Sequence, residues 1–129
     1  MNKHEAGFLE FIEEPNKRRL RTLFELGDKR RGDILSMLNH AIHLNPRYCS
    51  RLAGADQFAP TMELMLKKLG APDTCYVIGG GELDGHEMPL GEALSDLIGF
   101  GDGAFVSCLP GKLAYYQYEG MNGGHLCQR

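Results

Sequence analysis

The stretch Ala104-Phe-Val-Ser-Cys-Leu109-Pro-Gly-Lys-Leu113-Ala-Tyr-Tyr-Gln-Tyr-Glu119 decides the fold of the second half of this chain. Two runs rich in apolar, β-branched and aromatic residues flank Pro110-Gly111. Pro followed by Gly is favoured at the centre of a type II turn, so the pattern predicts a β-hairpin with strands over 104–109 and 113–119. Because an isolated hairpin is barely stable in water, this one has to pack against further strands or helices.

Residues on either side of the hairpin predict more strands and one helix. Thr74-Cys-Tyr-Val-Ile78 is a short apolar run closed by three glycines, which is typical of a buried strand. Pro89 begins a helix whose apolar residues recur at helical spacing until Gly99. A turn at 121–124 and a short strand over 125–129 follow the hairpin. We expect a small antiparallel sheet of three or four strands, covered by helices on one face.

The first half of the chain has the apolar periodicity of helices instead. Apolar residues three and four positions apart predict one helix around 8–12 and three more that begin near residues 15, 28 and 60. The helix that begins near residue 28 is expected to continue until Asn45-Pro46. The fold class is therefore α+β, with a helical N-terminal half packed on the small sheet and one covering helix in the C-terminal half. We expect a single domain over 1–129 with one core, helical and basic over 1–70 and β-rich and acidic over 71–129.

Length and composition exclude several classes of protein. The chain has 129 residues, of which 43% are hydrophobic and 24% charged, and this is enough for one domain without a stabilising metal or disulfide. No run approaches the 18 apolar residues of a membrane span, and the first residues lack the pattern of a signal peptide. We expect a cytoplasmic protein that binds no membrane and no cofactor.

The four cysteines are Cys49, Cys75, Cys108 and Cys127. No two of them form a CxxC pair, which is the spacing typical of a zinc site or a redox-active dithiol. Three of them lie in apolar runs, where a free cysteine behaves as a small buried hydrophobe, so we expect reduced structural thiols. Only Cys49, with Arg47 and Arg51 nearby in sequence, has the cationic neighbours that activate a nucleophilic thiol.

Motifs for nucleotide binding and for catalysis do not fit this chain. Gly79-Gly80-Gly81 follows a strand but matches neither GxGxxG nor GxxxxGK[ST], and no GxSxG motif is present. His40 and His43 can share a helix face, but no third metal ligand stands at a matching spacing. We therefore predict no metal site at these histidines.

An acidic loop is the one segment with the composition of a catalytic or cation site. Glu82-Leu-Asp84-Gly-His86-Glu87 places three carboxylates and an imidazole in six residues. In an extended segment Glu82, Asp84 and His86 would lie on one side. An exposed Asp-Gly turn with polar flanks has the same composition, so we lean toward a protein that is not an enzyme.

Tyrosines form a second candidate binding feature. Tyr116 and Tyr118 share one face of the last long strand, opposite Tyr115. Such a face can stack nucleic-acid bases or contact a protein, although tyrosine is also a common strand residue. The carboxylate of Glu119 beside them disfavours a phosphate backbone.

The formal charge of −3 conceals two halves of opposite sign. Residues 1–68 hold 12 basic and 9 acidic residues, a net of +3, whereas residues 69–129 hold 2 basic and 8 acidic residues, a net of −6. The basic excess lies in 15–51, which carries +6. Because basic residues near a helix start oppose its dipole, we expect an anionic group beside them. The cations selected as binding residues are Arg18, Arg19, Arg21, Lys29, Arg30 and Arg31.

The charge pattern leads to one expected function and two alternatives. We expect a non-catalytic interaction module that binds an acidic protein partner, or self-associates, through this basic helical corner. The first alternative is a nucleic-acid-associated protein using Arg18–Arg21 and Lys29–Arg31, which the pI of about 5.9 disfavours. The second is a small enzyme or cation site at Glu82–Glu87. The acidic half of the protein itself can also neutralise the corner.

Overall fold

The computed structural model describes residues 1–40, 42–54, 57–119 and 124–129. The α-helices in these ranges are α1 (Lys3–Leu9), α2 (Asn16–Leu26), α3 (Arg31–Asn39), α4 (Ala59–Lys68) and α5 (Leu90–Leu97). The strands are β1 (Cys49–Arg51), β2 (Thr74–Gly79), β3 (Glu87–Pro89), β4 (Ala104–Leu109), β5 (Leu113–Gln117) and β6 (Gly124–Gln128). The described ranges also contain the 3₁₀ helices η1 (Asp28–Arg30) and η3 (Gly81–Leu83). The α+β class predicted from the sequence is confirmed.

The strands form one antiparallel sheet in the order β1-β6-β5-β4-β2-β3. The hairpin predicted around Pro110-Gly111 is its centre, and Gly111 has the positive φ of 69° that a type II turn requires. The prediction of three or four strands is wrong, because the described residues form six. The two unexpected strands, β1 and β3, have three residues each and lie at the sheet edges, so neither leaves a long apolar run in the sequence.

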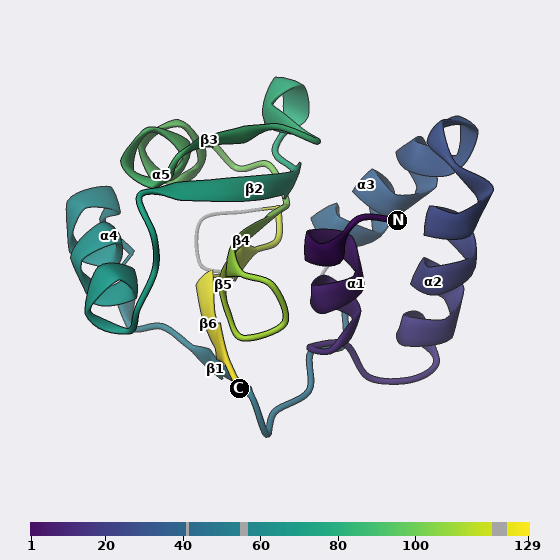
Figure 1. The fold of residues 1–129 in the computed structure, drawn as a ribbon, viewed down its shortest axis with the longest axis horizontal. Helices are drawn as coiled ribbons and strands as arrows, with labels where there is room; N and C mark the ends of the chain where they lie inside the picture. The colour runs from purple at the N-terminus through teal and green to yellow at the C-terminus, as the bar shows by residue number, and fades with distance from the viewer. Residues whose placement is uncertain (41, 55–56, 120–123) are drawn as a thin grey trace.

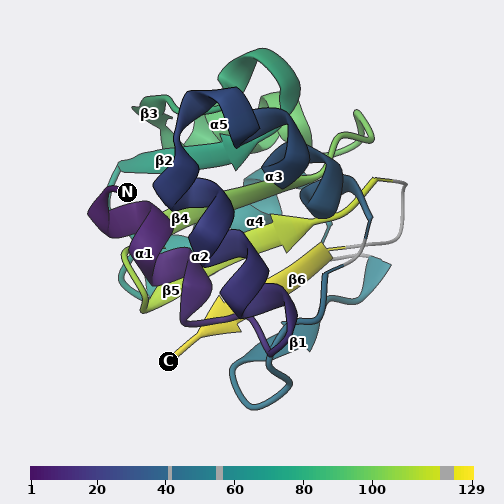
Figure 2. The ribbon, with the colours of Figure 1, turned by 90° about the vertical axis from the view of Figure 1, so that its right-hand side faces the viewer.

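Helices cover both faces of the sheet, whereas the sequence led us to expect one covered face. α1, α2 and α3 lie on one face, and α4 and α5 lie on the other (Figure 1). Figure 2 shows α1 and α2 in front of the strands. Alternation along β5 sends Tyr116 into the core beneath α1–α3 and Tyr115 into the core beneath α4 and α5. The described residues therefore form two cores separated by the sheet, rather than the one that was expected.

Two helices end earlier than their apolar periodicity predicts. α3 ends at Asn39, because the Asn39 side chain accepts a hydrogen bond from the Gly103 N–H (2.8 Å) and its carbonyl accepts one from the Glu119 N–H (3.1 Å). α1 ends at Leu9, and Ile12 beyond it forms an isolated antiparallel bridge with Leu44. The predicted turn at 121–124 falls largely on 120–123, outside the described residues.

The helical and β-rich halves of the sequence are interleaved in space. β1 from the first half pairs with β6 at the end of the chain, and α4 packs on α5. Among the described helices, none is long and apolar enough to cross a bilayer.

Candidate functional site: a basic cleft beside α2

Arg31, the last cation of the predicted corner, turns inward. Its Nε and Nη2 donate to the two carboxylate oxygens of Asp84, each at 2.8 Å, and its Nη1 donates to Glu5 at 2.5 Å. The hydrogen bond with Asp84 is the largest cause that raises the pKa of Arg31 above its usual value, and it outweighs burial. Because Asp84 belongs to the acidic half, the protein itself neutralises this cation.

Lys29 and Arg30, which precede Arg31 in the chain, stay at the surface. Arg30 Nε donates to Asp33 Oδ2 at 2.6 Å, and both side chains are about half exposed. Lys29 is exposed in η1. A solvent-exposed pair such as Arg30–Asp33 adds little stability, so Arg30 can exchange Asp33 for a ligand at small cost.

α2 presents a row of cations to solvent. Leu20 and Leu23 on its inner face are buried, and this leaves Arg18 and Arg21 exposed on the outer face, with Lys17 partly exposed beside them. Within the described part of the chain, the side chains of these three cations make no ion pair. The outer face of α2 is therefore a positively charged surface.

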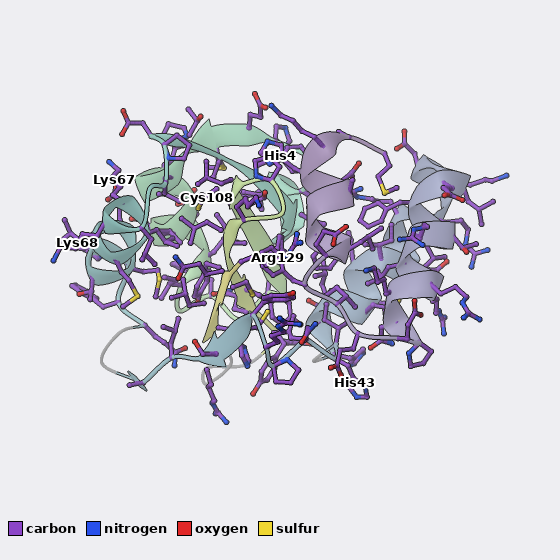
Figure 3. All side chains as sticks on the ribbon, turned by 60° about the horizontal axis from the view of Figure 1, so that its bottom comes forward. His4, His43, Lys67, Lys68, Cys108 and Arg129 are labelled. Atoms are coloured by element: carbon purple, nitrogen blue, oxygen red, sulfur yellow. The ribbon has the colours of Figure 1, made fainter. Side chains whose placement is uncertain are left out.

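The segment 42–45 lies beside α2 and is fixed by the backbone of the α1–α2 connection. The His43 N–H donates to Asn16 Oδ1 at 3.0 Å, and the His43 carbonyl accepts from the Glu13 N–H at 2.9 Å. The Asn45 N–H donates to the Phe11 carbonyl at 2.8 Å. The His43 side chain is exposed and projects from the surface in Figure 3.

Two hollows adjoin this segment and share Ile42 and His43, and we call them together the His43 cleft. The smaller has a volume of about 290 Å³ and is also lined by Asn16, Arg19, Ser36, Met37 and His40. The larger has a volume of about 640 Å³ and is also lined by Glu13, Leu44, Pro46, Cys49, Arg51, Tyr116, Tyr118 and His125.

The charge of the His43 cleft is one-sided. Basic or imidazole side chains reach it from α2, the end of α3, the segment 42–45, β1 and β6: Arg19, His40, His43, Arg51 and His125. Arg51 and His125 lie directly opposite each other in the β1–β6 pairing. Among the described lining residues, Glu13 is the only carboxylate. The cleft is suited to an anionic ligand, because its arginine side chains attract negative charge.

The two tyrosines selected from the sequence meet in this cleft with different roles. Tyr116 is buried, its hydroxyl donates to the Leu38 carbonyl at 2.7 Å, and burial raises its pKa. Tyr118 is partly exposed, and its ring centroid lies 6.3 Å from that of His125. Tyr118 is therefore the tyrosine that offers a ring to a ligand.

The acidic loop does not assemble as a site. The segment folds into η3 instead of an extended strand, and this directs Asp84 to Arg31 and to the Gly79 N–H (2.8 Å). Glu82, His86 and Glu87 are exposed. Among the described residues, no group of three or more His, Cys, Asp or Glu side chains is placed to hold a metal ion. Asp84 thus has a structural role, and its pairing with Arg31 is one of the outcomes that the charge pattern left open.

His40 and His43 stand out in the sequence only as a possible metal pair, and Arg51 and His125 do not stand out there as site residues. Three of these residues could have been grouped from the sequence, because His40, His43 and Arg51 stand close together in the chain. His125 has no such local signal, because only the pairing of β6 with β1 brings it there.

Comparison of this chain with protein-family models, with curated proteins and with solved structures gave no match. The function is therefore argued from the chemistry of the cleft.

Proposed function

We propose that this protein is a non-catalytic binding module that holds an acidic segment of a partner protein on α2 and in the His43 cleft. The observation that carries the proposal is the gathering of Arg19, His40, His43, Arg51 and His125 around two adjoining hollows beside α2. These residues come from separate elements of the fold. A surface of this charge attracts acidic partners and speeds their association.

The lining of the cleft supports a peptide more than a phosphate backbone. Ile42, Leu44 and Pro46 give it apolar wall, which suits the side chains between the acidic residues of a peptide. Glu13 and the net charge of −6 in residues 69–129 would repel the continuous charge of a nucleic acid.

Single-stranded nucleic acid is a second candidate because of one observation. The ring of Tyr118 lies beside His125, and both line the cleft with Arg51. Aromatic side chains next to an arginine can stack bases while the cation holds the backbone.

A second copy of the chain is another acidic partner. Exposed carboxylates stand on and around β3 and α5, at Glu82, Glu87, Glu92, Asp96 and Asp102. α5 lies on the face of the sheet away from α2 (Figure 1), so such pairing would join unlike surfaces head to tail.

Fluorescence anisotropy with a labelled peptide of ten glutamates tests the proposal. We expect binding at low salt that weakens at 200 mM NaCl. The double variant Arg18→Glu/Arg21→Glu should lose at least tenfold in affinity. Lys112→Glu, a single charge reversal at an exposed lysine of the β4–β5 turn, should bind as the wild type does.

Two further measurements separate the candidates. Tighter binding of a twenty-nucleotide oligothymidylate than of the peptide, lost in the same double variant, would replace the leading proposal by the second candidate. Light scattering that shows salt-sensitive dimers or chains of the wild type would identify the partner as a second copy. Equal peptide binding by the wild type and the double variant would show that the basic face is not the site.

A further inference from the structure

The four cysteines form two pairs across neighbouring strands. Cys49 lies opposite Cys127 in the β1–β6 pairing. Continuing the β2–β4 register by one residue from Tyr76 and Ser107 places Cys75 opposite Cys108. All four thiols are free and buried, and the two pairs lie on different faces of the sheet.

The Cys49–Cys127 pair occupies the type of position at which a disulfide fits between strands. The Gln128 N–H donates to the Tyr48 carbonyl (2.8 Å) and the Leu52 N–H to the Gly124 carbonyl (3.0 Å), so the backbone hydrogen bonds flank the cysteines and do not join them. At such non-hydrogen-bonded positions the Cα atoms are about 4.5 Å apart. Disulfides span Cα separations of about 4.4–6.8 Å.

We propose that Cys49 and Cys127 are an oxidative modification site that a peroxide closes to a disulfide. Cys49 lines the larger hollow of the His43 cleft, so a small oxidant reaches it from solvent. His43, Arg51 and His125 line the same hollow, and the guanidinium of Arg51 adds a positive charge beside the sulfur that attacks. This inference does not depend on which ligand the cleft binds.

The two thiols have different parts in the reaction. Cys127 is fully buried, and a hydrogen bond with the Cys49 thiol is the largest cause that raises its pKa, so Cys49 is the attacking group. The Cys49 thiolate attacks one oxygen of hydrogen peroxide, the O–O bond breaks, and protonation gives a sulfenic acid and one water. Cys127 sulfur then attacks the sulfenic sulfur, and the Cys127 proton leaves with the hydroxyl group as a second water. Two thiols are oxidised and one peroxide is reduced.

In the Cys75–Cys108 pair, burial holds both thiols in the protonated form. Burial raises the pKa of Cys75 and of Cys108 to about 12 each, so both are protonated thiols at neutral pH. The first step, attack on peroxide, needs a thiolate, so neither Cys75 nor Cys108 starts the reaction, although both line a hollow of about 250 Å³. The second pair is therefore an internal control for the first.

The disulfide would fasten a weakly held element of the cleft. β1 has three residues and pairs only with β6 among the described strands. A bond from Cys49 to Cys127 ties β1, which carries Arg51, to the last strand of the sheet. It also closes a long loop in the unfolded chain, so oxidation should raise the melting temperature by roughly 10 °C.

Peroxide treatment followed by trypsin digestion tests the site. The native protein is treated with equimolar hydrogen peroxide at pH 7, the peroxide is removed, remaining thiols are blocked with N-ethylmaleimide in urea, and the protein is digested without reduction. Cys49 then lies in peptide 48–51 and Cys127 in peptide 113–129, whereas Cys75 and Cys108 share peptide 69–112. We expect a mass for 48–51 joined to 113–129, two hydrogens below the sum, and peptide 69–112 with both thiols blocked.

Variants check each step of the reaction. Cys127→Ser should leave a sulfenic acid on Cys49 that dimedone traps, and Cys75→Ser/Cys108→Ser should still form the cross-link. A disulfide within 69–112 but none between 48–51 and 113–129 would overturn the proposal. Wild-type Cys49 that stayed reduced, or that passed to sulfinic acid without cross-linking, would overturn it as well.

Discussion

Arg31 joins the helical layer to the sheet through two carboxylates that lie far from each other in the chain. Glu5 comes from α1, and Asp84 follows η3. The network extends further, because Asp84 accepts from the Gly79 N–H and the Tyr76 hydroxyl donates to Glu5 at 3.5 Å. Removing the guanidinium would leave both carboxylates without their cation in a partly buried place.

Replacing Arg31 by methionine should lower the free energy of unfolding by about 3 kcal/mol. Methionine keeps much of the arginine side-chain volume. The loss of stability therefore comes from the unpaired carboxylates of Glu5 and Asp84 and not from a cavity. Urea unfolding followed by circular dichroism measures it. Arg30→Met, which removes the exposed partner of Asp33, is the matched control and should cost less than about 1 kcal/mol. Equal losses in the two variants would show that the buried network does not hold the layers together.

At the scale of elements, α1 lies directly against the turn between β4 and β5. A Cβ atom added at Gly7 would stand 2.3 Å from the Gly111 nitrogen and 2.9 Å from the Pro110 carbonyl carbon. Both are backbone atoms, which cannot rotate away as a side chain would. A residue without a side chain is therefore required at position 7 for α1 to pack this closely against the β4–β5 turn.

Gly7→Ala should destabilise the protein by about 2 kcal/mol, because the helix has to move away from the turn. Gly32→Ala in α3 is the matched control, since a Cβ there meets nothing within 4 Å. Alanine favours a helix more than glycine does, so Gly32→Ala should stabilise by about 0.5–1 kcal/mol. The melting temperatures of both variants are compared with that of the wild type by thermal unfolding. A Gly7→Ala variant more stable than the wild type would contradict the close packing of α1.

The elements that the sequence predicts well are those whose signals are local. The Pro110-Gly111 turn and the apolar spacing in α2, α4 and α5 were enough to place the hairpin and these helices. β1 and β3 were missed, because three-residue edge strands depend on pairing with β6 and β2 rather than on their own composition. The early end of α3 was missed because it also depends on tertiary contacts. Asn39 accepts hydrogen bonds from the backbone N–H groups of Gly103 and Glu119.

At the scale of the whole molecule, the core beneath α4 and α5 buries three groups that must stay protonated. Burial raises the pKa of Cys75 and Cys108 from 9.0 to about 12 and that of Tyr115 from 10.0 to about 12. In the unfolded chain these groups ionise near their ordinary values. The folded state thus binds more protons between pH 9 and pH 12, and its stability falls as pH rises through that range.

The free energy of unfolding should therefore fall by about 3 kcal/mol between pH 8 and pH 10. Urea midpoints measured across this range give the slope. In Cys75→Ala/Cys108→Ala the absolute stability will be lower, but the decline should be shallower because two of the titrating groups are gone. A variant whose stability fell as steeply as that of the wild type would show that these thiols are not the cause.

The arrangement of charge over the whole molecule was only partly predictable. The sequence indicated where the basic residues are concentrated, and Arg18, Arg19 and Arg21 do flank or line the candidate cleft. It could not show that Arg31 is used internally, because that depends on Asp84 crossing from the other half. Nor could it show that Arg51 and His125 meet, since the pairing of β1 with β6 is a tertiary contact.

Binding of an acidic partner to α2 and the His43 cleft is tested most directly by chemical-shift mapping. A ¹H–¹⁵N spectrum is recorded while the ten-glutamate peptide is titrated into the labelled protein at low salt. We predict that the largest shifts fall on the amides of Arg18–Arg21, His43, Arg51 and His125, and that those of α4 and α5 stay unchanged. Shifts confined to α4 and α5, or no shifts at a peptide excess, would contradict this binding site.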